Sequence, residues 1–304
     1  MRVLFIFLDG IGLGENDPAI NPLARAKMPN LNALLDGRSL IKDSAPFYGE
    51  HATLLAIDPA VGVSGLPQSA TGQGILVTGI NIPAELGYHY GPKPNPEVAA
   101  FLKDGSLFSR FAKAGRKTAL LNAYPPRYFD GIDSGKRLYS SIPLAVTNAG
   151  LALFRHDDLF AGRALSADFT GEGWRTMLGF SESPAMDPHH AGRKLATLSQ
   201  AYDFSLFEYW ASDYAGHKQE METAIGLMET FDSVLGGLIE AWNKAGLILV
   251  TSDHGNMEDL STRKHTDANV PALVIGDKTA RDEFTQDMKD LTDIAPAIWK
   301  TVMS

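Results

Sequence analysis

The chain contains no cysteine among its 304 residues, which excludes disulfide bonds, thiolate metal sites and cysteine catalysis. It also has no excess of basic residues. The formal net charge is −9, which argues against a general affinity for nucleic acid or anionic membranes, because both are bound first by basic patches. Long charged or low-complexity runs are absent as well. A hydrophobic content of 44% then predicts a globular chain with one large core, or a core plus a small insert.

The first ten residues, MRVLFIFLDG, contain an apolar run that is too short for a signal peptide or a membrane span. We therefore expect a cytoplasmic protein with no membrane partner. The run from Arg2 to Leu8 is typical of a strand buried on both faces, and it would deliver Asp9 to the carboxyl edge of a parallel sheet, where ligands usually bind. The glycines that follow do not have the GxGxxG spacing of a dinucleotide loop.

Strand and helix patterns alternate along the rest of the chain, which predicts an α/β fold with a mostly parallel central sheet. Helices are expected over Pro29 to Leu35, Ser106 to Gly115, about Glu220 to Lys244, and Asp293 to Val302. The third of these helices should stop at Ala245-Gly246. Further strands are expected over Ala52 to Ile57, Lys117 to Ala123, Phe204 to Trp210, Leu247 to Thr251, and Pro271 to Ile275.

The segment from about 124 to 187 differs from the rest of the chain in composition and in hydrophobic pattern. It is richer in glycine, proline and isolated charges, and it has no long periodic stretch. We therefore expect a catalytic core formed by 1–123 and 188–304, and a small inserted cap formed by 124–187. Basic residues of the cap are candidate anion contacts, although a surface arginine is more often simply solvated. They are Arg127, Lys136, Arg137, Arg155, Arg163 and Arg175.

Six residues of metal-ligand types lie at or near the ends of predicted elements. They are Asp9, Asp213, His217, Asp253, His254 and His265. Carboxylate and neutral imidazole suit zinc, manganese or magnesium, and six such groups are enough for two divalent ions. Asp213 and His217 are four residues apart and can share one face of a helical turn, whereas the adjacent Asp253 and His254 can converge only in a loop or sharp turn. A two-metal site predicts chemistry on an oxyanion.

Ser69, in the stretch GLPQSATGQ, is the candidate nucleophile. It lies in a run of small residues that we expect to pass from a loop into a helix. A helix N-terminus favours both an anionic ester and a developing alkoxide. Metal coordination is one way to hold a serine hydroxyl in its reactive, deprotonated form.

The order Asp9, Ser69, Asp213-xxx-His217, Asp253-His254, His265 resembles the metal and nucleophile signature of the alkaline phosphatase superfamily. The sequences around these residues are most similar to the cofactor-independent phosphoglycerate mutase and phosphopentomutase branch of that superfamily. FLDGIGLGENDPAINPLARAKMPNLNALL is similar to the opening of that branch, and TSDHGNMED and HTDANVP are similar to its closing metal motifs. The resemblance covers both ends of the chain and fades between about 124 and 187.

The resemblance implies a three-layer αβα sandwich and a serine that is transiently phosphorylated between two divalent ions, either manganese or zinc, with magnesium as a further option. By the family pattern, one ion would be held by Asp9, Ser69, Asp253 and His254. The other would be held by Asp213, His217 and His265.

The chain departs from the mutase pattern after the nucleophile, where Gln73 replaces the histidine of a usual Gly-His pair. This departure makes Thr71 a rival nucleophile. Asn256 is expected either to orient a phosphate oxygen or to cap the turn after His254.

We expect a small phosphorylated substrate. A phosphoric-ester hydrolase is favoured, because the insert is smaller than the second domain with which mutases hold a substrate while phosphate leaves and returns. A phosphomutase and an inactive binding homologue are the alternatives. A sulfatase would need a maturation motif that does not surround Ser69. The sequence leaves the oligomeric state open.

Overall fold

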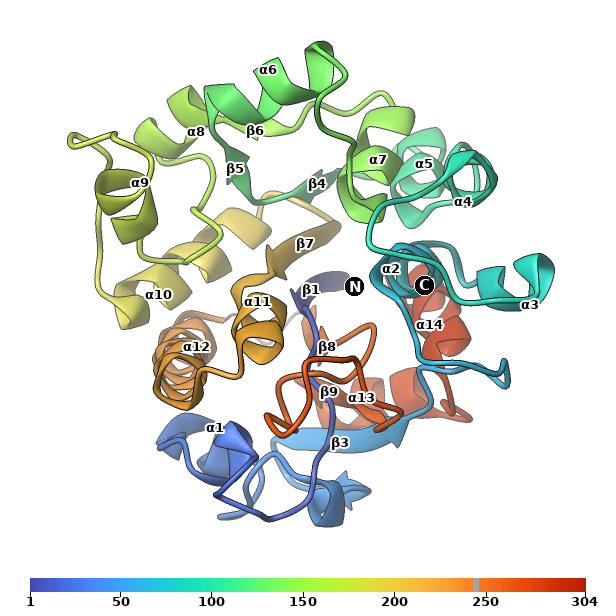
Figure 1. The fold of residues 1–304 in the computed structure, drawn as a ribbon, viewed down its shortest axis with the longest axis vertical. Coiled ribbons are helices and arrows are strands. Elements are labelled where there is room, and N and C mark those ends of the chain that lie inside the picture. Colours follow the sequence, from blue (N-terminus) through green and yellow to red (C-terminus); the bar gives the residue numbers. More distant parts are fainter. Residues whose placement is uncertain (243–245) are drawn as a thin grey trace.

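A seven-stranded sheet runs through the middle of the protein, in a computed structural model that describes residues 1–242 and 246–304 (Figure 1). In spatial order the strands are β2 (Phe47–Tyr48), β3 (Ala52–Ile57), β9 (Val270–Ile275), β8 (Gly246–Thr251), β1 (Arg2–Leu8), β7 (Phe204–Tyr209) and β4 (Thr118–Leu120). Strands β4, β7, β1 and β8 are parallel neighbours, whereas β9 is antiparallel to both β8 and β3. The sheet is therefore mostly but not purely parallel, as predicted.

The central strand β1 explains why both faces of the sheet are covered. Phe5 and Phe7 pack into one hydrophobic cluster, and Ile6 and Leu8 pack into a second cluster on the opposite face. Successive side chains of a strand point to opposite faces, so an uninterrupted apolar run fills two cores at once. The bounds of β1 are those predicted from the sequence.

Helices form a layer on each face of the sheet, which confirms the predicted three-layer αβα fold (Figure 1). One layer contains α2 (Ser69–Thr78), α4 (Pro96–Leu102), α5 (Leu107–Lys113), α7 (Ser141–Asn148) and α14 (Ile294–Met303). The other contains α1 (Pro29–Leu34), α10 (Pro188–Ser199) and α12 (Met221–Ala241). Among the helices of the described residues, none has both the length and the apolar composition that crossing a membrane requires.

Most predicted elements are present with small shifts at their ends. The predicted helix from Glu220 is α12 as far as Ala241, and its predicted end, Lys244 with the stop at Ala245, lies outside the described residues. The predicted strand Lys117 to Ala123 was too long. Its final residues leave the main sheet, because β5 (Ala123–Tyr124) pairs instead with β6 (Phe154–Arg155).

Asn122 marks the point of departure. Its side chain exchanges two hydrogen bonds of 2.8 Å with the backbone of Glu208 in β7. These side-chain bonds take the place of the next backbone bonds of the ladder. The amide of Ala123 then donates to the carbonyl of Leu165.

The segment 124–187 contains the short helices α6 (Pro126–Asp133), α7, α8 (His156–Phe160) and α9 (Glu172–Thr176). Helix α7 packs within the same hydrophobic cluster as β1, and the hydroxyl of Ser141 donates to the carbonyl of Ala70 in α2 at 2.7 Å. This part of the segment is therefore built into one helical layer. The role of 124–187 as a cap stays a prediction.

One edge of the sheet collects the ends of its three central strands. Asp9 directly follows β1, α11 (Ala211–Lys218) follows β7, and Asp253 comes two residues after β8. Because β9 is antiparallel to β8, the loop that precedes β9 lies at this same edge. A residue before a strand and residues after three other strands are thereby brought to one place.

Candidate metal centre

The structure brings the six predicted ligands and Ser69 to this edge of the sheet. Asp213 and His217 lie one turn apart in α11, and Asp253 and His254 lie in the turn after β8. Those two placements agree with the spacing argument made from the sequence.

Asp213, His217 and His265 form one group, in which one potential ligand atom of each residue lies within 4.8 Å of those of the other two. Nε2 of His217 is 3.3 Å from a carboxylate oxygen of Asp213, and Nε2 of His265 is 3.7 Å from the other oxygen. The two Nε2 atoms are 3.3 Å apart. The two Nε2 atoms and the carboxylate of Asp213 are therefore close enough together to bind a single ion.

His254 is the centre of a second, more buried group. Its Nε2 lies 3.6 Å from Oδ1 of Asp9, 3.5 Å from Oδ2 of Asp253 and 3.1 Å from Oγ of Ser69. Asp9, His254 and Asp213 also bring one ligand atom each within 4.8 Å of one another, so Asp213 lies between the two groups. The rings of His254 and His265 stack with centroids 3.7 Å apart.

The backbone determines which ring nitrogen of each histidine faces the site. Nδ1 of His217 lies 2.7 Å from the carbonyl of Arg263, and Nδ1 of His265 lies 2.8 Å from the carbonyl of Pro67. A carbonyl can only accept, so each Nδ1 is the donor, and in the neutral form of each ring Nε2 then carries the lone pair. Two lone pairs that face each other at 3.3 Å repel unless a cation lies between them.

Burial keeps the inner histidines neutral, which is the form that binds metals. It lowers the pKa of His254 well below its usual value, and the neighbouring His265 adds to the effect. Burial also lowers the pKa of His265, against the opposing effect of its contact with the carbonyl of Pro67.

Burial disfavours the charged form of the carboxylates as well, which raises their pKa values. Burial, followed by the negative charges of Asp253 and Asp213, raises the pKa of Asp9 well above its usual value. Burial likewise raises the pKa of Asp253, and the charge of Asp213 adds to it. No described residue makes a hydrogen bond of ordinary geometry to either carboxylate oxygen of Asp253 or to Oδ1 of Asp9. Buried polar atoms are normally paired, so this donor set fits divalent cations, which would stabilise the ionised carboxylates.

Ser69 is the first residue of α2, and its side chain faces the metal-ligand cluster. Thr71, the rival nucleophile, is fully buried and points elsewhere. Its hydroxyl lies 3.1 Å from the carbonyl of Gln68 and 3.3 Å from the carbonyl of Tyr90, and it accepts from the amide of Tyr90. The hydroxyl of Thr71 therefore links α2 to the loop that contains Tyr90.

Asn256 makes a contact that neither sequence alternative included. Its Nδ2 donates to Oδ1 of Asp213 at 2.6 Å and to the backbone carbonyl of Asp213 at 3.1 Å. The amide therefore orients a predicted ligand. Sequence spacing carried no signal for it, because 43 residues separate the partners.

Glu208 in β7 is a polar residue that sequence analysis missed, and its charge acts on Asp9. It is 6% exposed, and it accepts a hydrogen bond of 2.7 Å from the hydroxyl of Tyr124. Burial raises its pKa to about 7, although the hydrogen bond from Tyr124 and the charge of Lys93 act in the opposite direction. The available signal was a single acid within the otherwise apolar strand of the sequence FSLFEYW.

Three of the candidate anion-binding arginines of 124–187 contact residues of that same segment. Arg163 pairs with Asp158 at 2.8 Å, and Arg175 lies 3.7 Å from Glu172. The guanidinium of Arg155 lies over the ring of Phe129 at 3.9 Å from its centroid.

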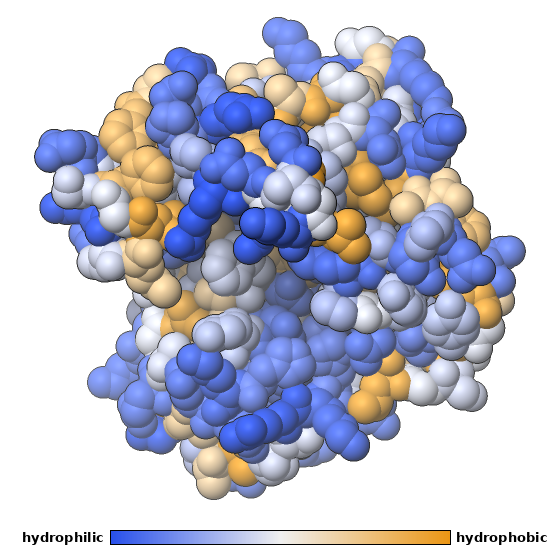
Figure 2. Space-filling view, turned by 45° about the horizontal axis from the view of Figure 1, so that its top comes forward, coloured by the Kyte–Doolittle hydropathy of each residue, from blue (hydrophilic) through white to orange (hydrophobic). Residues whose placement is uncertain are grey.

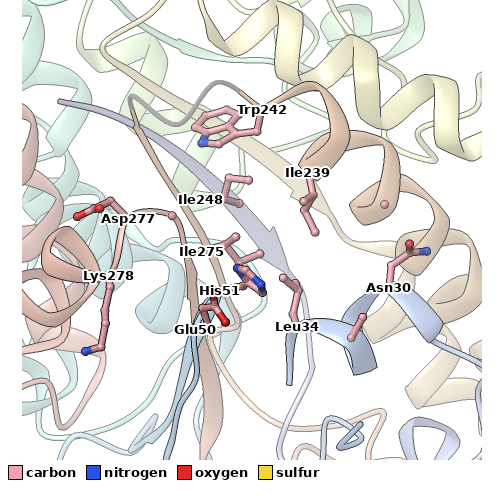
Figure 3. Close-up of a pocket in the computed structure, with 13 residues that line it drawn as sticks. Asn30, Leu34, Glu50, His51, Ile239, Trp242, Ile248, Ile275, Asp277 and Lys278 are labelled. Atoms are coloured by element: carbon pink, nitrogen blue, oxygen red, sulfur yellow. The ribbon is translucent and has the colours of Figure 1, made fainter. Parts of the chain in front are cut away.

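A pocket of about 700 Å³ lies away from the metal-ligand cluster, against the start of β8 and the end of β9 (Figure 3). Its walls include Leu34, Ile239, Trp242 and Ile275, with Lys278 at the rim. Strand direction places this pocket at the opposite edge of the sheet. It therefore plays no part in the candidate metal centre.

Comparison with known proteins agrees with this geometry. Residues 175–304 match the family model described as the Metalloenzyme superfamily, and this range contains five of the six predicted ligands. The 2,3-bisphosphoglycerate-independent phosphoglycerate mutase of Rhodopseudomonas palustris is 28% identical over 235 residues, which cover 67% of this chain and 45% of that protein. The aligned part of the chain thus spans less than half of this relative.

Solved structures share the fold at low sequence identity. The alkaline phosphatase from the Antarctic bacterium TAB5 superposes with a TM-score of 0.58 at 14% identity, covering 99% of this chain and 98% of that one. The phosphoglycerate mutase of Leishmania mexicana superposes with a TM-score of 0.50 at 12% identity, covering 99% and 95%. These structures share the fold, and the family model and the phosphoglycerate mutase relative support a metalloenzyme of the alkaline phosphatase superfamily, near the 2,3-bisphosphoglycerate-independent phosphoglycerate mutase branch.

Proposed function

We propose that the protein is a two-metal phosphoryl-transfer enzyme that hydrolyses a small phosphoric ester through a phosphoserine at Ser69. One observation carries the proposal. The hydroxyl of Ser69, at the N-terminus of α2, lies 3.1 Å from Nε2 of His254, beside two buried carboxylates that have unpaired oxygens.

The proposed ligand sets are those of the family pattern. Asp9, Ser69, Asp253 and His254 would hold one ion, and Asp213, His217 and His265 the other. When bound, manganese or zinc ions would neutralise the carboxylates and favour the alkoxide form of the serine. The convergence of the Nε2 lone pairs supports this assignment.

The residues of the chain would act in a fixed order. Oγ of Ser69 forms a bond to phosphorus while the ester P–O bond breaks and the alcohol leaves with a proton. Water then adds to phosphorus as the bond to Oγ breaks, which regenerates the serine and releases inorganic phosphate. The amide of Thr71 donates to the carbonyl of Tyr90, so the amides of Ser69 and Ala70, with the positive dipole end of α2, would favour the negative charge on the phosphoryl group.

Release of phosphate to water is favoured over its return to the substrate. The segment 124–187, which we propose as a cap over the site, offers little material to retain an intermediate. Figure 2 shows a hollow near the middle of the molecular face in view, with largely hydrophilic surroundings. A phosphomutase is the second candidate, because the phosphoglycerate mutases of Rhodopseudomonas palustris and Pseudomonas fluorescens are among the relatives of this chain. A cytoplasmic location stays a prediction.

Replacement of Ser69 tests the nucleophile. We expect Ser69→Ala to reduce turnover of a responsive phosphomonoester by roughly 10³-fold or more, because it removes the hydroxyl that lies beside His254 and would form the covalent intermediate. Metal content, measured by elemental analysis, should stay nearly unchanged. Ser64→Ala, at an exposed serine of the preceding loop, is the matched control and should retain activity. Full activity of Ser69→Ala would exclude this assignment.

The fate of the phosphoryl group separates hydrolysis from mutase chemistry. In water labelled with ¹⁸O, a hydrolase releases inorganic phosphate that contains one labelled oxygen. A mutase returns the phosphoryl group to an organic product without the label. Mass spectrometry of the products distinguishes the two outcomes, and an unlabelled isomeric phosphate ester as the main product would contradict the hydrolase proposal.

A further inference from the structure

Glu258 is a buried carboxylate that lies just outside the ligand cluster. It is 2% exposed, and its two oxygens accept hydrogen bonds from three separate segments. Oε2 accepts from the amide of Gly12 at 2.9 Å and from the amide of Asn256 at 2.7 Å. Oε1 accepts from the hydroxyl of Thr266.

Each of these three donors belongs to a segment that carries a proposed ligand. Gly12 comes three residues after Asp9, Asn256 comes two residues after His254, and Thr266 directly follows His265. The side chain of Asn256 extends the connection to a fourth segment, because it donates to Oδ1 of Asp213 at 2.6 Å. One carboxylate therefore joins segments that follow β1, follow β8 and precede β9.

Three neighbouring glycines lie so close to Glu258 that a side chain at any of them would collide with it. A Cβ on Gly12 would lie 2.5 Å from Cδ of Glu258, and a Cβ on Gly14 would lie 2.9 Å from its Cβ. A Cβ on Gly255 would collide with both Thr266 and Oε1 of Glu258. Gly12 and Gly14 of DGIGLG, a stretch that does not fit a dinucleotide loop, thus have a different physical role. They let the backbone lie close against Glu258, and the amide of Gly12 donates to it, whereas Gly10 lies against Asp213.

We propose that Glu258 is a positioning residue that sets the geometry of the metal centre by holding the Asp9, His254 and His265 segments in register. Its hydrogen bonds are to Gly12, Asn256 and Thr266, which are neighbours of the proposed ligands in the sequence. Its contribution is to bring amide and hydroxyl donors from three loops onto one acceptor pair, so that the ligands of both proposed ions converge. The inference rests on the proposed metal centre but not on the identity of the reaction.

Metal affinity tests this role independently of turnover. We expect Glu258→Ala to weaken binding of Mn²⁺, measured by titration calorimetry on the metal-free full chain, by roughly 10-fold or more, as for other groups that orient ligands. Glu258→Gln should retain most of the affinity, because its carbonyl oxygen can accept from Gly12 and Asn256 while its amide donates to the hydroxyl of Thr266.

Asp232 supplies the matched control. It is a buried carboxylate of α12 that accepts from the amide of Leu31 at 2.7 Å and from Nδ2 of Asn30 at 2.9 Å, and so joins α12 to α1. We expect Asp232→Ala to lower stability while leaving Mn²⁺ affinity unchanged. Equal losses of affinity in Asp232→Ala and Glu258→Ala would overturn the positioning role, because general loosening would then explain both.

A double-mutant cycle keeps the inference testable even if Glu258→Ala folds poorly. Gly12→Ala places a methyl group against the carboxylate of Glu258, and we expect it to weaken Mn²⁺ binding in the otherwise native chain. In the Glu258→Gln background, where a similarly sized group remains, the loss should persist. In the Glu258→Ala background it should largely disappear. Native Mn²⁺ affinity in both Gly12→Ala and Glu258→Ala would overturn this inference alone, whereas no Mn²⁺ binding by the unaltered protein would overturn the metal centre itself.

Discussion

At the scale of single residues, the protein buries acidic side chains, and burial of an ionised carboxylate costs free energy of folding. Glu208 lies on β7, with Phe204 and Leu206 on the same face of the strand, and all three alternate with residues that point into the opposite cluster. Its register places it beside Phe7, two residues before Asp9. An acid at this position is desolvated by the core and is close enough to Asp9 to raise the pKa of that carboxyl.

The pH dependence of stability follows from Glu208. Its folded-state pKa of about 7 is above the usual 4.5, so the folded state binds the proton more tightly than the unfolded state does. The resulting stability is complete below pH 4.5 and is lost as the pH rises through about 7. Glu208→Gln is neutral at every pH and keeps an acceptor for Tyr124. We expect the variant to gain roughly 3 kcal/mol relative to the native chain between pH 4.5 and 7.5.

Urea unfolding of both proteins in the presence of a chelator, over that pH range, measures this difference. The chelator removes any contribution from bound metal. A difference between the two free energies of unfolding that stays constant with pH would contradict the proposed titration.

At the scale of elements, α10 and α12 pack so closely that their backbones are in contact. A Cβ on Gly192 of α10 would collide with the carbonyl of Val234, and a Cβ on Gly237 of α12 would collide with the carbonyl of His189. Glycine is unfavourable within a helix, so its presence at both crossing points reflects the close approach of the two helices. The periodic apolar positions predicted the helix α12, but they carried no information about this approach.

Two glycine substitutions separate packing from helix propensity. We expect Gly192→Ala to lower the free energy of unfolding by about 1–3 kcal/mol, because the helices must move apart to admit a methyl group. Gly226 of α12 is exposed, and a Cβ there would meet nothing within 4 Å. Gly226→Ala should therefore raise the free energy by about 0.5–1 kcal/mol. Denaturant unfolding measures both changes, and similar effects of the two substitutions would refute the packing argument.

At the scale of the whole molecule, ions bound at the proposed metal centre would be coupled to the stability of the fold. Buried Asp9 and Asp253 destabilise the metal-free fold when they are ionised, since burial raises the pKa of both carboxyls. A cation that binds only the folded state would remove that cost and add binding free energy. The extra stability is about 2.7 kcal/mol when the free ion is at 100 times its dissociation constant.

Thermal unfolding with Mn²⁺ or with a chelator tests this coupling. We expect Mn²⁺ to raise the Tm of the native chain by several degrees and a chelator to reverse the rise. Asp253→Asn should respond much less to Mn²⁺, yet its Tm in chelator should equal or exceed that of the native chain, because a buried charge has been removed. An undiminished Mn²⁺ response in Asp253→Asn would argue against Asp253 as a ligand.

The sequence by itself determined the fold class and most elements, because a strand buried on both faces and an amphipathic helix each leave a local pattern. The uninterrupted run of β1 and the periodic apolar residues of α12 are examples. The order of acids, histidines and Ser69 along the chain likewise indicated a two-metal site before any geometry was considered. These signals are carried by residue type and by spacing within single segments.

Only the tertiary structure decided how the separate segments meet. It turned the hydroxyl of Thr71 toward Tyr90 and that of Ser69 toward His254, and it paired Asn256 with Asp213. It also placed Glu258 where three loops converge. The physical reason is that hydrogen bonds between segments tens to hundreds of residues apart depend on strand order and direction, which leave no periodic trace in the sequence.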